Sequence, residues 1–250
     1  MAASLSVIPE IIRITVRQLL GRRRTLLLLL LAALPVLLAF IFQLAVPANA
    51  DKYANVVFDT VSLSVILPLA AVLFGTGAFG AENDEGTILY LLAKPIPRWV
   101  IVAGKTLAAV GMTVAMTVGA VLLAGLVDLF PSGPDGIAAT EAHVAAMVVG
   151  SVCYVALFIP MSLLTRRALV IGIGYALVWE VTLSSLLPGI ANLSIRQYAL
   201  GVADWFFQIH REPARLSSTT AVILAGVLVA ASLSLAVWRL MRFELPGGSD

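Results

Sequence analysis

Six long apolar stretches, nearly free of charged side chains, limit what this chain can fold into more than any other feature of its sequence. A bilayer core of about 30 Å is crossed by about 20 mostly apolar residues in a helix. Stretches of this kind lie at about 25–46, 56–80, 99–127, 141–164, 168–188 and 218–240. Backbone polar groups in lipid must be satisfied within their own segment, which requires helices. The sequence therefore predicts an all-α membrane protein with six transmembrane helices, in a single transmembrane domain over residues 1–250.

The composition agrees with this fold class and excludes others. Hydrophobic residues make up 60% of the chain and charged residues 12%, and the mean hydropathy is +1.02. Soluble domains carry about 25% charged residues, so a soluble enzyme is excluded. The net charge of +2 is too small to indicate a nucleic-acid partner. With one cysteine and two histidines, we predict no metal site.

The positions of lysine and arginine predict how the chain is oriented. If the N-terminus is inside, the inner segments hold twelve of the 16 basic residues and the outer segments hold four. Cytoplasmic loops carry such an excess of positive charge. The connection over residues 128–140 contains acids and no base, as expected of an outer loop. We therefore predict that both termini are cytoplasmic.

The first 24 residues form a separate element. Apolar residues recur there at helical spacing, while Glu10, Arg13 and Arg17 fall largely on the other side. The residues of the apolar side are Leu5, Ile8, Ile12, Val16, Leu19 and Leu20. This pattern predicts an amphipathic helix in the headgroup plane of the membrane. The alternative is a cytosolic helix that packs on a partner.

Motifs for nucleotide chemistry are weak or missing in the sequence. Gly75, Gly77 and Gly80 match G-x-G-x-x-G, but they end an apolar span and follow no predicted strand. Small residues there favour close helix packing instead. The sequence contains no G-x-x-x-x-G-K-[ST] phosphate loop. We therefore expect no cofactor bound by this chain and no catalytic residue in it.

Glu180 is the only acid well inside a predicted span. A carboxylate in lipid is costly unless it is protonated, paired or hydrated, so it marks a candidate polar site within the membrane. The alternative is a structural role, either in a pair with Arg196 or in a hydrated outer vestibule. Asp59, by contrast, lies near the outer end of the second predicted span, where a charge requires no special explanation.

The inner connection after the second span, residues 82–98, predicts a short cytosolic helix. Asp84 and Glu85 stand at its start and Lys94 at its end, as the helix dipole favours. Pro95 ends the helix. One face is apolar and carries Ile88, Leu91 and Leu92. Such a helix can pack under the membrane helices while its acidic start faces the cytosol.

This connection also carries a resemblance to a known family. The residues concerned are Glu85-Gly86-Thr87-Ile88, Leu91-Leu92, Pro95-Ile96, Arg98 and Lys105. They resemble the loop after the second span in permeases of the ABC-2 type, the membrane subunits of ATP-binding cassette transporters. The order of elements along the chain is similar as well. The resemblance implies a permease, expected to be an exporter in the plasma membrane, that works with a second membrane subunit and two ATPase subunits.

The resemblance further implies that this connection is the coupling helix that docks on the ATPase. The matching positions are Glu82, Asp84, Glu85, Gly86, Thr87, Ile88, Leu91, Leu92, Pro95 and Arg98. Glu82 and Glu85 would meet the ATPase, Gly86 would allow close approach, and Arg98 would anchor the loop. ATP and Mg²⁺ would be bound by the partner, since this chain has no ATPase domain of its own.

The segment 189–217, between the fifth and sixth spans, is long for a turn and contains Trp205, Phe206, Phe207 and Ile209. We predict short outer helices there, either re-entrant or interfacial. Two other functions stay open. An ion-coupled secondary transporter would use Glu180 and the helix breaks at Pro68 and at Gly172 and Gly174. A membrane scaffold or assembly factor would use the loop for docking alone.

Overall fold

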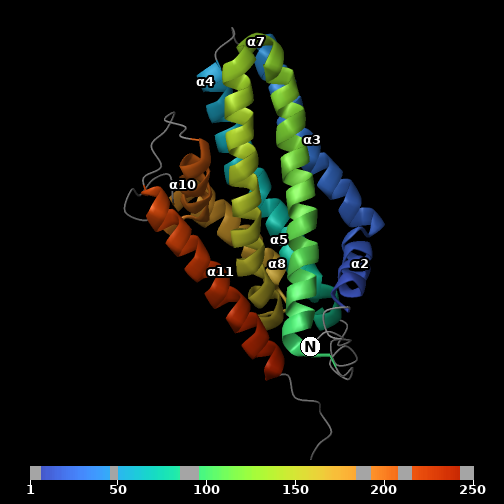
Figure 1. Ribbon diagram of the computed structural model, residues 1–250. Helices are drawn as coiled ribbons and strands as arrows, with labels where there is room; N and C mark the ends of the chain where they lie inside the picture. Colours follow the sequence, from blue (N-terminus) through green and yellow to red (C-terminus); the bar gives the residue numbers. More distant parts are fainter. Residues whose placement is uncertain (1–6, 46–49, 85–95, 184–192, 208–215, 243–250) are drawn as a thin grey trace, which may run out of the picture.

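The computed structural model describes residues 7–45, 50–84, 96–183, 193–207 and 216–242. Within these ranges the regular structure is helical and contains no strand (Figure 1). The elements are α2 (Ile8–Leu19), α3 (Arg22–Ala45), α4 (Ala50–Tyr53), η1 (Ala54–Ile66), α5 (Leu67–Asp84), α7 (Arg98–Leu164), α8 (Ala168–Gly174), η2 (Tyr175–Leu183), α10 (Ile195–Phe207) and α11 (Ser218–Met241). The prediction of an all-α fold is confirmed for this part of the chain.

Four of the described helical stretches are long and apolar enough to cross a membrane. They are Ala54–Gly80, Arg98–Leu129, Gly133–Leu164 and Ser218–Met241, and they coincide with the second, third, fourth and sixth predicted spans. Two shorter apolar helices, Leu28–Leu44 and Ala168–Glu180, lie within the first and fifth predicted spans. The described residues are thus consistent with an all-α membrane protein, and the count of six spans stays a prediction.

The third and fourth predicted spans join in one helical hairpin, α7, which bends at Gly133. Gly133 has φ 55° and ψ −134°, a conformation that only glycine adopts readily. The prediction of a connecting loop over residues 128–140 is wrong, because helix continues to Leu129 and resumes at Gly133. Pro134 stands in the first turn of the second arm, where a helix tolerates a missing N–H. The acidic stretch that follows is therefore helical.

Two segments, η1 and η2, are π-helices, in which backbone hydrogen bonds join residues five apart instead of four. Hydroxyl groups in them donate to carbonyls five residues back, as Ser62 does to Val57 at 2.7 Å and Thr182 to Leu177 at 3.1 Å. The first segment ends at Ile66, two residues before Pro68 of α5, which lacks a backbone N–H. Sequence periodicity did not distinguish these segments from α-helix.

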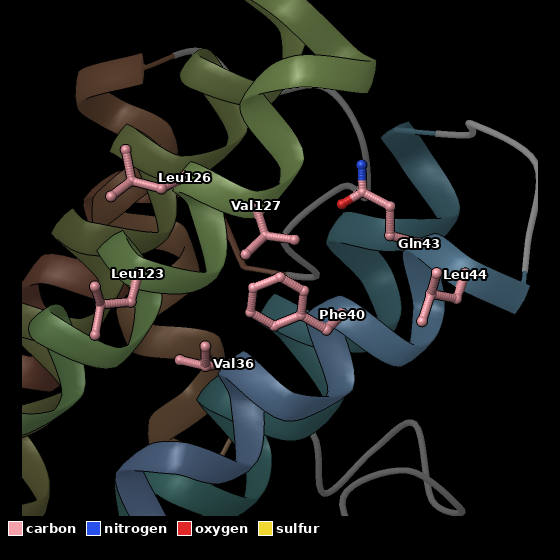
Figure 2. A pocket seen from close by; sticks show the side chains of 7 residues that line it. All are labelled: Val36, Phe40, Gln43, Leu44, Leu123, Leu126 and Val127. Atoms are coloured by element: carbon pink, nitrogen blue, oxygen red, sulfur yellow. The ribbon is translucent and has the colours of Figure 1, made fainter.

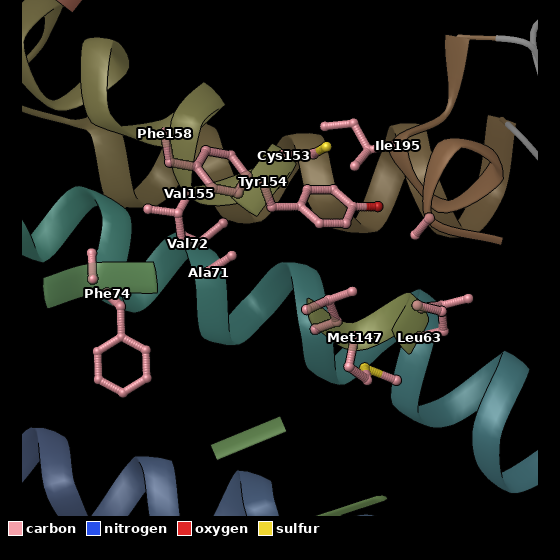
Figure 3. Close-up of a cluster of buried hydrophobic side chains, with 14 of the residues drawn as sticks. Leu63, Ala71, Val72, Phe74, Met147, Cys153, Tyr154, Val155, Phe158 and Ile195 are labelled. Carbon is pink, nitrogen blue, oxygen red and sulfur yellow. The ribbon is translucent and has the colours of Figure 1, made fainter. Parts of the chain in front are cut away.

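Buried apolar side chains from η1, α5 and the second arm of α7 pack together in the core (Figure 3). A Cβ at Gly75 would lie 2.9 Å from the Cβ of Phe158, and one at Gly150 would lie 2.5 Å from Leu67. Close approach of this kind matters because helices in lipid associate through van der Waals packing. The predicted packing role is confirmed at Gly75, whereas Gly80 faces open space.

The remaining helices surround the α7 hairpin. Helix α3 crosses it on one side and α11 on the other, and α10 packs against both α11 and α7 (Figure 1). Helix α10 confirms a helix between the fifth and sixth predicted spans; the side chains of Trp205, Phe206 and Phe207, and all of Ile209, lie outside the description.

Helix α2 packs on α5 and on the start of α7. Its buried line is Ile11, Thr15 and Leu19, while Glu10, Arg13 and Arg17 are exposed. The amphipathic pattern is confirmed, but its buried side is turned by about one residue from the predicted one. Leu20, expected on the apolar side, is 46% exposed. The reason is that Gly104 of α7 has no side chain, so Ile11 packs directly against the backbone of α7 there.

Candidate functional site

Most of the predicted coupling helix lies outside the described residues. This applies to Glu85, Gly86, Thr87, Ile88, Leu91, Leu92 and Pro95. Its two flanks are described, because α5 runs to Asp84 and α7 begins at Arg98. Of Asp84 only the backbone is described. The docking role of these residues therefore stays a prediction, and the flanks show how the segment joins the membrane helices.

Lys105 joins the two flanks. Its side chain is buried between α5 and α7, and its Nζ lies 2.8 Å from Oε1 of Glu82 and 2.5 Å from the carbonyl oxygen of Ala78. The ammonium group also lies 4.8 Å from the centre of the Phe79 ring. A buried cation is tolerable only when it is paired and hydrogen-bonded, and these contacts meet that condition. Lys105 thereby holds the last turns of α5 against α7.

Glu82, predicted to meet an ATPase, is engaged inside the protein. Its side chain is 15% exposed, and Oε1 is occupied by Lys105. Oε2 is buried without a hydrogen-bond partner in the part of the chain that the structure describes. Glu82 therefore contributes at least as much to the flank as to any outer surface.

Arg98 connects the start of α7 to the end of α11. Its Nη1 donates to the backbone carbonyl of Leu240 at 2.5 Å. The last carbonyls of a helix lack partners within the helix and carry partial negative charge, so a cation there is stabilising. The structure places Arg98, the first residue of α7, in contact with the end of α11, while its predicted role in anchoring the loop stays a prediction. With Ile11 of α2 seated on Gly104, three helices meet the first two turns of α7.

Glu180, the predicted intramembrane acid, is 2% exposed and lies in η2. Its Oε2 accepts from the Ser194 hydroxyl at 2.5 Å, and its Oε1 accepts from the backbone N–H of Ile195 at 3.0 Å. The Tyr175 hydroxyl also donates to Oε1, at 3.3 Å. The carboxylate therefore binds the first turn of α10, in addition to a tyrosine of its own helix.

A second polar cluster forms around Asp59, for which the sequence required no explanation. Oδ1 of Asp59 in η1 lies 3.7 Å from Nη2 of Arg196 and 3.4 Å from Nε2 of His143. The other ring nitrogen of His143 lies 2.7 Å from the carbonyl oxygen of Ala139. Arg196, considered from the sequence as a partner for Glu180, thus contacts Asp59. No local spacing could have revealed this, because Asp59 and His143 are 84 residues apart.

An open apolar groove of about 560 Å³ lies between α3 and the first arm of α7. Figure 2 shows its lining of Val36, Phe40, Gln43, Leu44, Leu123, Leu126 and Val127. Gln43 is the one polar residue in this lining. The groove suits hydrocarbon and offers no charged group to a ligand. Among the described residues, no group of three or more His, Cys, Asp or Glu is placed to hold a metal ion.

Comparison with known proteins agrees with the geometry of a membrane transport subunit. A family model described as ABC-2 family transporter protein matches residues 10–245, nearly the whole chain. Comparison with curated proteins finds no match. The match extends far beyond residues 82–105, to which the resemblance in sequence letters is confined. Permeases of this family are membrane transport subunits and are not themselves catalytic. The chain belongs to the ABC-2 family of transporter proteins.

Proposed function

We propose that this chain is the permease subunit of an ATP-binding cassette exporter in a plasma membrane. Separate ATPase subunits would dock on the segment 82–98, and a second membrane subunit would complete the transport path. Both termini would be cytoplasmic. Membership of the ABC-2 family supports the transport role, and the observation that carries the mechanism is the buried contact of Lys105 with Glu82 and Ala78.

That contact gives a docked ATPase a mechanical connection to the membrane helices. The segment 85–95 leaves α5 at Asp84 and enters α7 at Arg98. Lys105 holds these two helices together, and Arg98 holds α7 to the end of α11. A displacement of the segment would therefore move α5, α7 and α11 together. Coupled movement of this kind can drive alternating access between two membrane subunits.

ATP and Mg²⁺ would be bound by the partner ATPase, which supplies the chemistry of hydrolysis. This chain would contribute the acidic start of the docking segment, at Asp84 and Glu85, and the rigid attachment of its flanks. Charges at the rim of an interface guide association and suppress wrong partners. Glu85 is therefore the residue whose charge reversal should affect docking most directly.

We expect Glu85→Lys to weaken capture of the ATPase by about tenfold or more. The lysine would place a positive charge against a docking cleft that is complementary to an acidic residue. The tagged full-length chain would be purified from its own host in mild detergent, and the proteins that accompany it identified by mass spectrometry. Glu141→Lys is the matched control, because Glu141 is an exposed acid in the second arm of α7. It should retain the ATPase at the level of the parent.

Absence of an ATPase under several detergents would contradict the proposal, and so would equal loss in the two variants. Transport that followed an ion gradient rather than ATP would favour the ion-coupled alternative, which needs Glu180 to exchange its partners. The donors from Ser194, Ile195 and Tyr175 favour a holding role for Glu180 instead. Docking of an ATPase with no flux of any substrate would favour a scaffold.

A further inference from the structure

The first turn of α10 is bound by two acids from two different π-helices. Glu180 of η2 accepts from the Ser194 hydroxyl and the Ile195 backbone N–H, at 2.5 and 3.0 Å. Asp59 of η1 pairs with the guanidinium of the next residue, Arg196, at 3.7 Å. The three consecutive residues 194–196 are thus attached both to η1, in the N-terminal half of the chain, and to η2, in the C-terminal half. The sequence of no single segment predicts that these contacts form.

These contacts are hydrogen bonds and an ion pair to carboxylates, which are stronger than hydrogen bonds between neutral groups. The first N–H groups of a helix have no partner within it, and a carboxylate there is favoured by the helix dipole. Glu180 is almost fully buried, so loss of these donors would leave a buried polar group without partners that it needs. Asp59 also lies 3.4 Å from His143 on α7. The two acids therefore tie α10 to η1, to η2 and to the second arm of α7.

The placement of both acids in π-helices is informative. π-Helices are rare and appear mostly as single-turn bulges inside α-helices, frequently at functional sites. Within the described residues, each of the two π-helices, η1 and η2, presents one acid to α10. A wide turn is also a place where a helix can revert to the narrower α form, which would move the acid along the helix axis.

Helix α10 covers a buried part of α7 that contains Cys153 and Tyr154. Ile195 and Tyr198 of α10 belong to the same buried cluster, and Ile195 lies next to Cys153 in Figure 3. Burial, followed by the nearby charge of Glu180, raises the pKa of Tyr198. A Cβ at Gly150 of α7 would lie 3.4 Å from the Cβ of Ala199 of α10, so the two helices pack closely at this level.

We propose that Asp59 and Glu180 are positioning residues that clamp α10 onto α7, and that release of this clamp opens the adjacent end of the transport path. This end is the one predicted to face outward. The opening role rests on the proposed permease function, whereas the clamp itself does not. While the clamp is closed, α10 shields Cys153; when it is open, Cys153 becomes accessible.

Cys153 is the one cysteine of the chain, so it reports on α10 without any engineered label. The full-length protein in lipid nanodiscs would be treated with N-ethylmaleimide, and the modified fraction followed by mass spectrometry. We expect slow labelling in the parent and a rate about tenfold higher or more in the double variant Asp59→Asn with Glu180→Gln, because hydrogen bonds to charged groups are lost. Glu141→Gln, at an exposed acid, should label at the parental rate.

Two further variants separate clamp opening from misfolding. Asp59→Glu keeps the charge and should stay close to the parent, whereas Ser194→Ala removes one donor to Glu180 and should give a smaller increase than the double variant. A misfolded fraction would label in a fast burst, while opening gives one exponential for the whole population. Labelling rates equal to the parent in the double variant would overturn the clamp.

The opening role is tested in the complex with the co-purified ATPase. We expect Cys153 of the parent to label at different rates with and without ATP, Mg²⁺ and vanadate, and the double variant to label fast in both states. Equal protection of the parent in both states would overturn the opening role. Failure to recover any ATPase would contradict the proposed function alone, because labelling of the isolated chain in nanodiscs needs no partner.

Discussion

Replacing Lys105 by methionine is expected to cost about 3–5 kcal/mol of stability, the effect of removing one partner of a buried ion pair. Methionine keeps the approximate volume of the side chain but leaves the Glu82 carboxylate without its cation. It also removes the hydrogen bond to the carbonyl of Ala78. For a chain of this length, such a loss lowers the midpoint of thermal unfolding by roughly 10 °C. Tryptophan fluorescence of the purified protein in detergent during heating measures this shift.

The double variant Lys105→Met with Glu82→Gln provides the control. It removes both charges, and replacing a buried pair by uncharged groups of similar size is often nearly neutral. We expect it to recover most of the lost stability. If Lys105→Met unfolds at the same temperature as the parent, the pair is solvated and does not hold α5 to α7. That result would also remove the main structural support for a mechanical connection to segment 85–95.

The second large effect is expected at Gly75, where α5 meets the second arm of α7. A Cβ at this position would lie 2.9 Å from the Cβ of Phe158 and 3.6 Å from backbone atoms of Val155. Neither neighbour can move aside without shifting the helix, because a Cβ is fixed to its backbone. Overpacking of this kind costs about 1–3 kcal/mol or more. We therefore expect Gly75→Leu to give little monodisperse protein in size-exclusion chromatography.

Gly111→Leu is the matched control for this prediction. Gly111 lies in the first arm of α7, is exposed, and has open space where its Cβ would be. The same substitution there adds the same apolar volume to a spanning helix. It should leave the yield and the elution profile close to those of the parent. Similar losses in both variants would mean that leucine is disfavoured for a reason other than the α5–α7 contact.

The helical elements could be predicted from the sequence because their cause is local. A span must be long and apolar enough to cross the bilayer, and both properties are visible in consecutive residues. Four predicted spans, the amphipathic N-terminal helix and a helix after the fifth span were found as helices. The letters of residues 82–105 likewise indicated the family that the match over residues 10–245 confirms.

The errors in the prediction also have local explanations. Hydropathy averaged over a span cannot show that a turn needs only the few residues around Gly133, since one glycine conformation reverses the chain. Nor can it distinguish a π-helix from an α-helix, because both present apolar residues on all sides in a buried span. The observed buried side of α2 differs from the predicted one by about one residue, because Ile11 packs against Gly104 of α7.

The sequence by itself therefore determined the class of molecule and the extent of most helices, since both depend on the solvent that a continuous segment meets. It also indicated the family, through the residues of segment 82–105. Only the tertiary structure decided which polar groups meet. Lys105 finds Glu82, Arg98 finds the end of α11, and two acids find the first turn of α10. A buried charge must find a partner wherever the packed helices place one, and the distance along the chain does not enter into that choice.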